Sequence, residues 1–314
     1  MPFVRFGGRV TFRSMQPAID SLRHWELPGR AVFEIGAGGL PRLVVKSSIV
    51  AAHIYLHGAH ITHFQPAGMS PVLFLSASSL FVPDKAIRGG VPVIFPWFGP
   101  RGSTIGAPVH GFARTMRWAV ASVACDPDDS VTATFCLTAS DVTRAQWPHD
   151  FTLRYRITVG TTLAMRLEVE NKSAEPFPFE EALHTYLAVG DVRRVTLTGL
   201  AGTEFIDKVD HFTRKRQDDA PIRITGETDR VYLHTRSSCV LDDPSVDRQI
   251  IVEKSGSQTT VVWNPWMAKA AAMVDFGNEE WTKMLCVETA NAGENAVTLA
   301  PGATHVMEAV VRVV

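Results

Sequence analysis

Two arginines and a histidine flank an apolar segment that proline interrupts repeatedly. Arg88 is followed by two glycines and the run 91–100, and His110 and Arg114 come shortly afterwards. A planar guanidinium donates two parallel hydrogen bonds, which suit a phosphate or carboxylate. Glycine allows a backbone to approach a ligand closely. The pattern is compatible with an anion-binding wall, but glycine and proline also mark ordinary turns, and most surface arginines bind nothing specific.

A histidine follows two acidic residues within the apolar segment 177–187. If this segment is a strand, period-two alternation places His184 on one face with Glu180, Ala182 and Tyr186. Histidine is the side chain whose charge changes most readily near neutral pH, so it can move a proton. A single histidine in a strand is nevertheless more often a structural residue.

A glutamate lies in the apolar segment 285–291, at Glu288. Burying a carboxylate is costly unless it is hydrogen-bonded or used in chemistry. Burial would raise its pKa and make it a better base near neutral pH. The alternative is a glutamate at a strand end that faces solvent.

Two further motifs contain residues that suit sugar recognition. Asp229 ends a Glu-Thr-Asp step just before an aromatic strand, where an isolated aspartate would be read as a turn residue. The run 261–266 contains Trp263 and Trp266, which either belong to the core or form a platform for a sugar ring.

The histidines and cysteines do not predict a metal site. His53, His57, His60 and His63 cluster, but in a strand His57 and His60 face opposite sides, and no acidic ligand has matching spacing. The four cysteines form no Cys-x-x-Cys pair, so neither a zinc site nor a thioredoxin-like motif is indicated. Scattered cysteines are typical of a reducing compartment, and we expect a cytoplasmic protein.

A glycosidase is also disfavoured. Glu180 and Glu181 are adjacent, so in a strand they point to opposite faces and cannot flank one glycosidic bond.

Composition narrows the function classes further. The chain has 314 residues, of which 46% are hydrophobic, and a net charge of −1. This charge does not suggest a nucleic-acid-binding surface. No apolar run approaches the roughly 20 residues that span a bilayer, so a membrane protein is not expected.

Most of the segments that must position these residues have the alternating pattern of β-strands. Residues 152–159 and 163–170 alternate apolar and polar side chains around a turn at Gly160 and Thr161, which predicts a hairpin. Other strand-like runs are 42–46, 49–57, 60–66, 117–124, 131–138, 193–198, 247–254, 259–263 and 305–313. The segments 15–25 and 140–147 predict short helices, 76–87 a loop, and 36–39 a hairpin turn. We therefore expect an all-β sandwich or barrel, with an extension at 1–30 and one domain at 31–314.

Taken together, these motifs resemble the glucose-6-phosphate 1-epimerase family, the hexose-6-phosphate mutarotases of the aldose-epimerase superfamily. The matching pieces follow the family's order from about Gly58 to the end: Gly58-Ala59-His60, Leu75-Ser76, 88–100, 110–114, His184-Thr185-Tyr186, Asp229, 261–266 and 285–291. The resemblance implies a large antiparallel β-sandwich of the galactose mutarotase type with few short helices.

The resemblance also implies the reaction and the site. A member of this family interconverts the α and β anomers of an aldohexose 6-phosphate, with glucose 6-phosphate the first choice, and needs no cofactor or metal. His184 and Glu288 would be the catalytic acid and base. Arg88 and Arg114 would bind the phosphate, and Asp229 and His110 would also contact the substrate.

One departure bears on sugar preference. Some family members have glutamine just before the His-Gly step, where this chain has Val109. Two other functions remain open: a non-catalytic sugar-phosphate sensor on the same fold, and an aldose 1-epimerase for unphosphorylated sugars. The oligomeric state is not indicated, although a monomer is slightly favoured.

Overall fold

A computed structural model describes residues 19–101 and 107–314 of the chain. Antiparallel strands are the main regular elements among the described residues, and most of these strands belong to two eight-stranded sheets. The first, which we call the β20 sheet, has the order β15 (Thr213–Arg216), β14 (Glu204–Asp207), β16 (Thr228–Tyr232), β19 (Thr259–Asn264), β20 (Met284–Asn291), β11 (Glu181–Leu183) and β5 (Val93–Ile94), with β12 (Tyr186–Ala188) also paired to β20.

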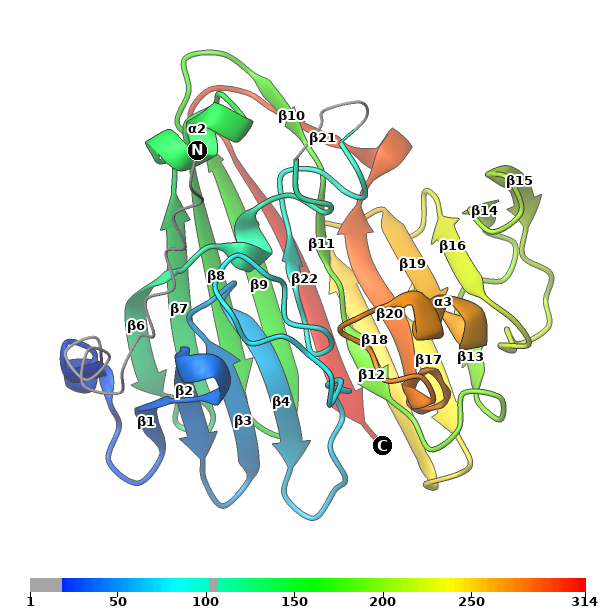
Figure 1. Ribbon diagram of the computed structural model, residues 1–314, viewed down its shortest axis with the longest axis horizontal. Helices are drawn as coiled ribbons and strands as arrows, with labels where there is room; N and C mark the ends of the chain where they lie inside the picture. Colours follow the sequence, from blue (N-terminus) through cyan, green and yellow to red (C-terminus); the bar gives the residue numbers. More distant parts are fainter. Residues whose placement is uncertain (1–18, 102–106) are drawn as a thin grey trace, which may run out of the picture.

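The second sheet, which we call the β22 sheet, contains the longest strands. Its order is β13 (Thr196–Thr198), β17 (Cys239–Asp243), β18 (Arg248–Ser255), β22 (Thr304–Val313), β9 (Leu163–Asn171), β8 (Phe151–Val159), β7 (Val131–Thr138) and β6 (Ala119–Cys125). In Figure 1, the red strand β22 crosses the middle of the molecule between green β9 and yellow β18.

Two smaller sheets complete the architecture. A four-stranded meander in blue contains β1 (Ala31–Ile35), β2 (Pro41–Lys46), β3 (Val50–Tyr55) and β4 (His60–Pro66). A two-stranded ribbon contains β10 (Phe177–Phe179) and β21 (Val297–Leu299).

The helices among the described residues are short. The α-helices are α2 (Asp141–Gln146) and α3 (Trp266–Ala272), and the 3₁₀ helices are Arg23–Trp25, Ala37–Gly39, Ala113–Thr115, Glu280–Lys283 and Gly293–Asn295. None of the helices in these ranges is long and apolar enough to cross a bilayer.

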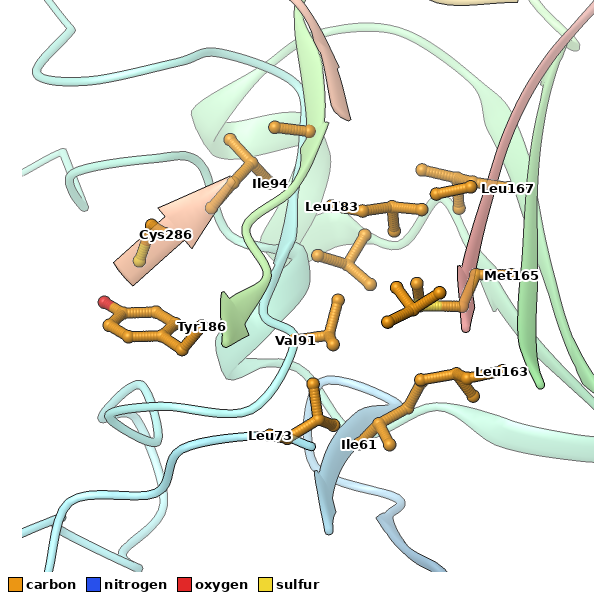
Figure 2. Packing of buried hydrophobic residues seen from close by; sticks show 14 of the residues in the cluster. Ile61, Leu73, Val91, Ile94, Leu163, Met165, Leu167, Leu183, Tyr186 and Cys286 are labelled. Atoms are coloured by element: carbon orange, nitrogen blue, oxygen red, sulfur yellow. The ribbon is translucent and has the colours of Figure 1, made fainter. Parts of the chain in front are cut away.

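The core lies between the sheets. Figure 2 shows Leu183 of β11 pointing towards Leu163, Met165 and Leu167 of β9, all of them buried. Tyr186 lies on the opposite side of its strand in the same view. The β20 sheet therefore has one face that packs on β9 and a second face on which Tyr186 and Cys286 are also buried.

The predicted hairpin at 152–170 is confirmed as β8 and β9. Alternate residues of both strands are buried, and the register pairs Thr158 with Ala164. The all-β sandwich, the helix near 140–147, the hairpin turn at 36–39 and the loop at 76–87 are confirmed as well.

Several details differ from the prediction. The segment 177–187 is divided into β10, β11 and β12 rather than forming one strand, and the strand expected at 193–198 begins only at Thr196. The pattern also missed β1, β5, β14, β15, β17, β21 and α3. Part of the expected helix at 15–25 falls outside the described residues, and the remainder contains the 3₁₀ helix Arg23–Trp25.

Part of the predicted N-terminal extension packs on the domain. Ile19 and Leu22 are buried within the same hydrophobic core as the sandwich strands. Residues 1–18 of the extension lie outside the described ranges, so the boundary at residue 30 stays a prediction.

Candidate functional site

His184 and Glu288 face each other across neighbouring strands. Both β11 and β12 pair with β20, and two residues, His184 and Thr185, separate them. The register of pairing with β20 is the same before and after these two residues. His184 is the first of these residues, so it lies opposite Glu288, and directly opposed side chains in an antiparallel pair are close neighbours. The distance from Nε2 of His184 to Oε1 of Glu288 is 3.3 Å.

The ring of His184 is enclosed by aromatic side chains. It stacks on Tyr186 with 4.8 Å between the ring centroids, as their predicted common face requires, and meets Trp263 edge-on at 6.0 Å. Its Nδ1 atom is buried and has no hydrogen-bond partner. Burial, followed by the positive charges of Arg114 and Arg88, holds the pKa of His184 well below its ordinary value.

Glu288 is buried at the centre of the β20 sheet. It is 1% exposed, and all eight residues of β20 are buried, which excludes the alternative of a solvent-facing strand end. Its Oε2 atom has no hydrogen-bond partner. Burial, together with the negative charge of Asp229, raises the pKa of Glu288 well above its ordinary value, while Lys208 and Arg114 oppose that rise.

The two arginines differ in their hydrogen-bond partners. Arg88 donates to the hydroxyl of Tyr186 at 3.0 Å and to a carboxylate oxygen of Asp275 at 3.1 Å. Burial lowers the pKa of Arg88, but Tyr186 and Asp275 outweigh it and the net shift is upward. The backbone carbonyl of Val109 accepts a hydrogen bond of 2.7 Å from Arg114.

Arg114 is thus held by a neutral group. None of the ion pairs among the described residues includes it, and its Nε atom is buried without a partner. Burial and the charge of Arg88 lower the pKa of Arg114 to about 10. The positive charges of the two neighbouring guanidinium groups repel each other. A bound anion would relieve this repulsion and be stabilised beside them.

The loop that carries Arg88 depends on its two glycines. Gly89 and Gly90 have φ angles of +112° and +61°. A Cβ atom on Gly89 would lie 2.5 Å from the carbonyl oxygen of Phe74, and one on Gly90 would lie 2.1 Å from that of Ile61. Both the conformation and the close approach therefore require glycine, as the sequence indicated.

The histidine cluster supports this loop. His57 forms an isolated β-bridge with Arg117 between β3 and β4 and lies in neither strand, so the expectation that it faces away from His60 on one strand is wrong. Its Nε2 atom is 2.7 Å from the carbonyl oxygen of Lys85, and Nε2 of His60 is 2.7 Å from that of Gly89. These two histidines hold the backbone on both sides of Arg88.

Asp229 lies within β16 rather than in a turn. It pairs in register with Trp263 of β19, two strands away from Glu288. Its carboxylate is 3.2 Å from the ammonium group of Lys208. Trp263 contacts His184 and Tyr186, whereas Trp266 packs on Trp281 at 4.3 Å. Trp263 is therefore part of the site, and Trp266 belongs to packing outside it.

His110 lies beside His184, with 5.7 Å between the ring centroids. It adopts a φ angle of +65°, and its Nδ1 atom accepts a hydrogen bond from the backbone N–H of Gly99 at 3.1 Å. Burial and the charge of Arg114 hold its pKa well below the ordinary value. A neutral imidazole whose Nδ1 accepts has its proton on Nε2, which can then donate to a ligand.

The structure thus brings all six predicted residues together by direct contact or electrostatic coupling around the His184–Glu288 pair. The sequence reasoning missed three residues: Lys208, Asp275 and Cys286. Cys286 had a signal, because it is two residues before Glu288 in a strand and so shares its face. Lys208 and Asp275 had none, since only long-range pairing brings them here.

Comparisons with known proteins find similarity over most of the chain. The aldose 1-epimerase family model matches residues 41–312. A protein of Escherichia coli named "putative glucose-6-phosphate 1-epimerase" is 39% identical over 271 residues, covering 86% of this chain and 90% of the relative. A relative of the same name from Cenchrus ciliaris is 34% identical, covering 84% of this chain and 82% of the relative.

A solved structure is similar over almost the whole chain. The crystal structure of a protein from Salmonella typhimurium, described as a "putative mutarotase", superposes with a TM-score of 0.85 at 34% identity and covers 92% of this chain and 95% of its own. Because the family model spans most of the chain and the relatives share its full architecture, the chain belongs to the aldose 1-epimerase family.

Proposed function

We propose that this protein interconverts the α and β anomers of an aldohexose 6-phosphate, with glucose 6-phosphate as the preferred substrate. The observation that carries the proposal is the buried pair of His184 and Glu288, 3.3 Å apart, beside an arginine that has no carboxylate partner among the described residues. The pair can move two protons, and Arg114 can bind a phosphate. The names of the relatives favour the same substrate class.

The reaction needs one base and one acid. Glu288, as the carboxylate, takes the proton from the anomeric hydroxyl, and His184, as the imidazolium, gives a proton to the ring oxygen. The bond between the anomeric carbon and the ring oxygen breaks, and the open-chain aldehyde forms. After rotation about the adjacent carbon–carbon bond, the two residues exchange roles and the ring closes as the other anomer. General acid–base catalysis of this kind contributes about 10²–10⁴-fold.

The pair holds a single proton throughout this cycle. Ring opening converts carboxylate and imidazolium into carboxylic acid and neutral imidazole, and ring closure reverses the change. The raised pKa of Glu288 and the lowered pKa of His184 favour the neutral form in the free protein. Transfer of one proton from Glu288 to His184 converts this neutral form into the reactive ion pair.

Phosphate binding would favour the reactive form. Arg114 and Arg88 are, after burial, the leading causes of the lowered pKa of His184. A dianionic phosphate at these guanidiniums neutralises their charge, so the pKa of His184 rises and imidazolium becomes easier to form. The phosphate then contributes to the rate of the chemical step as well as to binding.

The remaining polar groups position the sugar. Asp229 accepts hydrogen bonds from sugar hydroxyls, and His110 donates from Nε2. Holding a reactant in place supplies rate enhancement beyond proton transfer. The four cysteines are free, which fits the reducing cytoplasm as the compartment of this reaction.

The decisive experiment measures anomer exchange by NMR. With the wild-type protein, exchange between α- and β-glucose 6-phosphate should be much faster than in buffer, while free glucose, galactose and mannose respond far less. Binding without acceleration would indicate the sugar-phosphate sensor instead. Equal acceleration of phosphorylated and free sugars would indicate an aldose 1-epimerase without phosphate recognition.

A further inference from the structure

Three metal-ligating side chains meet on the face of the β20 sheet that carries the proton-moving pair. His184, Cys286 and Glu288 each offer one ligand atom, and these atoms all lie within 4.8 Å of one another. Among the described residues, this is the only group of three or more such side chains. All three are buried, so the group is not a chance gathering of exposed acidic residues.

The sheet register fixes this arrangement. Cys286 and Glu288 are two residues apart in β20, so their side chains leave the same face. His184 lies opposite Glu288, and Tyr186 is paired with Cys286. The ligand atoms are therefore held by two neighbouring segments, β20 and the short break between β11 and β12, whose register with β20 is continuous.

We propose that His184 Nε2, Cys286 Sγ and a carboxylate oxygen of Glu288 form a binding site for a thiophilic divalent cation such as Zn²⁺, and that the bound ion inhibits the enzyme reversibly. Binding rests on the geometry alone, whereas inhibition rests on the proposed function, because the ion occupies both proton-moving groups.

The spacing of His184 and Glu288 suits tetrahedral zinc. Bonds of about 2.0–2.3 Å to nitrogen, oxygen and sulfur place ligand atoms about 3.3–3.8 Å apart. The His184–Glu288 separation of 3.3 Å already has this value. The second oxygen of Glu288 is buried without a partner, so the carboxylate can turn towards an ion without breaking a hydrogen bond.

The ligand types select the metal. A thiolate with an imidazole favours Zn²⁺, Co²⁺ and Cd²⁺, whereas Mg²⁺ and Ca²⁺ prefer all-oxygen sites. Binding releases the proton of the Cys286 thiol and that of the Glu288 carboxyl to solvent, while neutral His184 donates its lone pair. Because binding releases these protons, affinity increases with pH.

The surroundings limit the affinity. Nδ1 of His184 lacks the hydrogen-bond acceptor that usually supports a zinc-binding histidine. The charges of Arg114 and Lys208 also oppose a cation, although Asp229 favours one. We therefore expect reversible inhibition rather than a permanently bound structural ion, and the enzyme treated with a chelator should be fully active.

The binding arm of the test uses Co²⁺, because a thiolate–Co²⁺ bond produces a charge-transfer absorption in the near ultraviolet. The full chain, freed of metal with chelator, is titrated with Co²⁺. We expect the band in wild type and in Cys239→Ala, since Cys239 is a buried cysteine of the β22 sheet, and no band in Cys286→Ala. Its absence from wild type, or its persistence in folded Cys286→Ala, would overturn the site.

The inhibition arm follows anomer exchange with glucose 6-phosphate. Zn²⁺ should slow exchange in wild type, EDTA should restore the full rate, and Mg²⁺ at the same concentration should have no effect. Cys286 takes no proton in the reaction, so Cys286→Ala and Cys286→Ser remain measurable, with the Zn²⁺ concentration for half-inhibition raised at least about tenfold. Equal Zn²⁺ sensitivity in all these proteins would contradict the proposal. If wild type catalyses no exchange, the Co²⁺ band still tests the site separately from the function.

Discussion

At the residue scale, the buried atoms without partners are the clearest mark of function. Oε2 of Glu288 and Nδ1 of His184 are both buried and unpaired. A buried polar group without a hydrogen bond costs about 1–3 kcal/mol. A site that binds polyhydroxylated sugars supplies the missing partners when the substrate enters, so the unpaired groups fit a binding site.

The two arginines should separate phosphate binding from local structure. In Arg114→Ala, KM for glucose 6-phosphate should rise roughly ten- to a hundredfold, since a charged hydrogen bond contributes about 1.5–3 kcal/mol. The activity towards free glucose should change little. Arg114→Lys should recover only part of the loss, because lysine keeps the charge but not the planar fork.

Arg88→Ala serves as the matched comparison. It should also raise KM for the phosphorylated sugar, but it leaves Tyr186 and Asp275 without their partner, so its melting temperature should fall more than that of Arg114→Ala. If both variants treat phosphorylated and free sugars alike, these arginines do not recognise phosphate.

The pH profile tests the electrostatics of the pair. Catalysis requires one proton on His184 and Glu288 together, so activity falls at low pH when a second proton binds and at high pH when the last is lost. Asp229 raises the pKa of Glu288 and Lys208 lowers it. In kcat/KM profiles, Asp229→Asn should therefore move the alkaline limb to lower pH, and Lys208→Met should move it to higher pH. Shifts in the same direction would refute this account of the coupling.

At the element scale, the sequence predicted the faces of the site residues correctly, although the single strand expected at 177–187 is broken between β11 and β12. Alternation along 177–187 correctly places His184 with Tyr186 because the register continues through the break. The pattern could not show that the ladder is interrupted at His184. It also could not place Lys208 and Asp275, since neither a short-range motif nor periodicity encodes contacts between distant segments.

A second ionic contact links β11 to the β22 sheet. His305 of β22 lies 2.9 Å from the carboxylate of Glu181, which is fully buried. Burial lowers the pKa of His305, but the hydrogen bond and charge of Glu181 outweigh it and the net shift is upward. A pKa raised above the unfolded value stabilises the fold fully below about pH 6.5, and the contribution is lost as pH rises through the folded pKa.

His305→Gln should reveal this contribution in chemical denaturation followed across pH. The loss in unfolding free energy should be largest below about pH 6.5, where we expect roughly 1 kcal/mol after allowing for partial exposure, and it should shrink at higher pH. A loss that is constant with pH would show that the contact is not ionic.

At the scale of the whole molecule, the sandwich separates stability from chemistry. One face of the β20 sheet packs on β9, and the other carries the site, as Figure 2 shows for Leu183 and Tyr186. The strand periodicity was sufficient to predict an all-β fold and its longest hairpin. It did not predict β14, β15 and β17, which have only four, four and five residues, so each offers too few positions for a period-two pattern to stand out.

This separation predicts a stability variant with intact catalysis. Leu167 of β9 is fully buried in the core. Leu167→Ala should lower the unfolding free energy by about 2–5 kcal/mol while leaving KM and kcat of the folded enzyme nearly unchanged. Val142→Ala, on the exposed side of α2, is the control and should alter neither stability nor rate. A large change in KM for Leu167→Ala would mean that the core and the site are coupled.

The central claim is that His184 and Glu288 carry out anomer exchange on a hexose phosphate. The most direct measurement is the exchange rate between α- and β-glucose 6-phosphate, by NMR, for wild type, His184→Asn and Glu288→Gln. Circular dichroism and melting temperature confirm that each variant is folded. The account predicts rapid exchange in wild type and nearly none above the spontaneous rate in either variant. Wild-type exchange in either folded variant would contradict it.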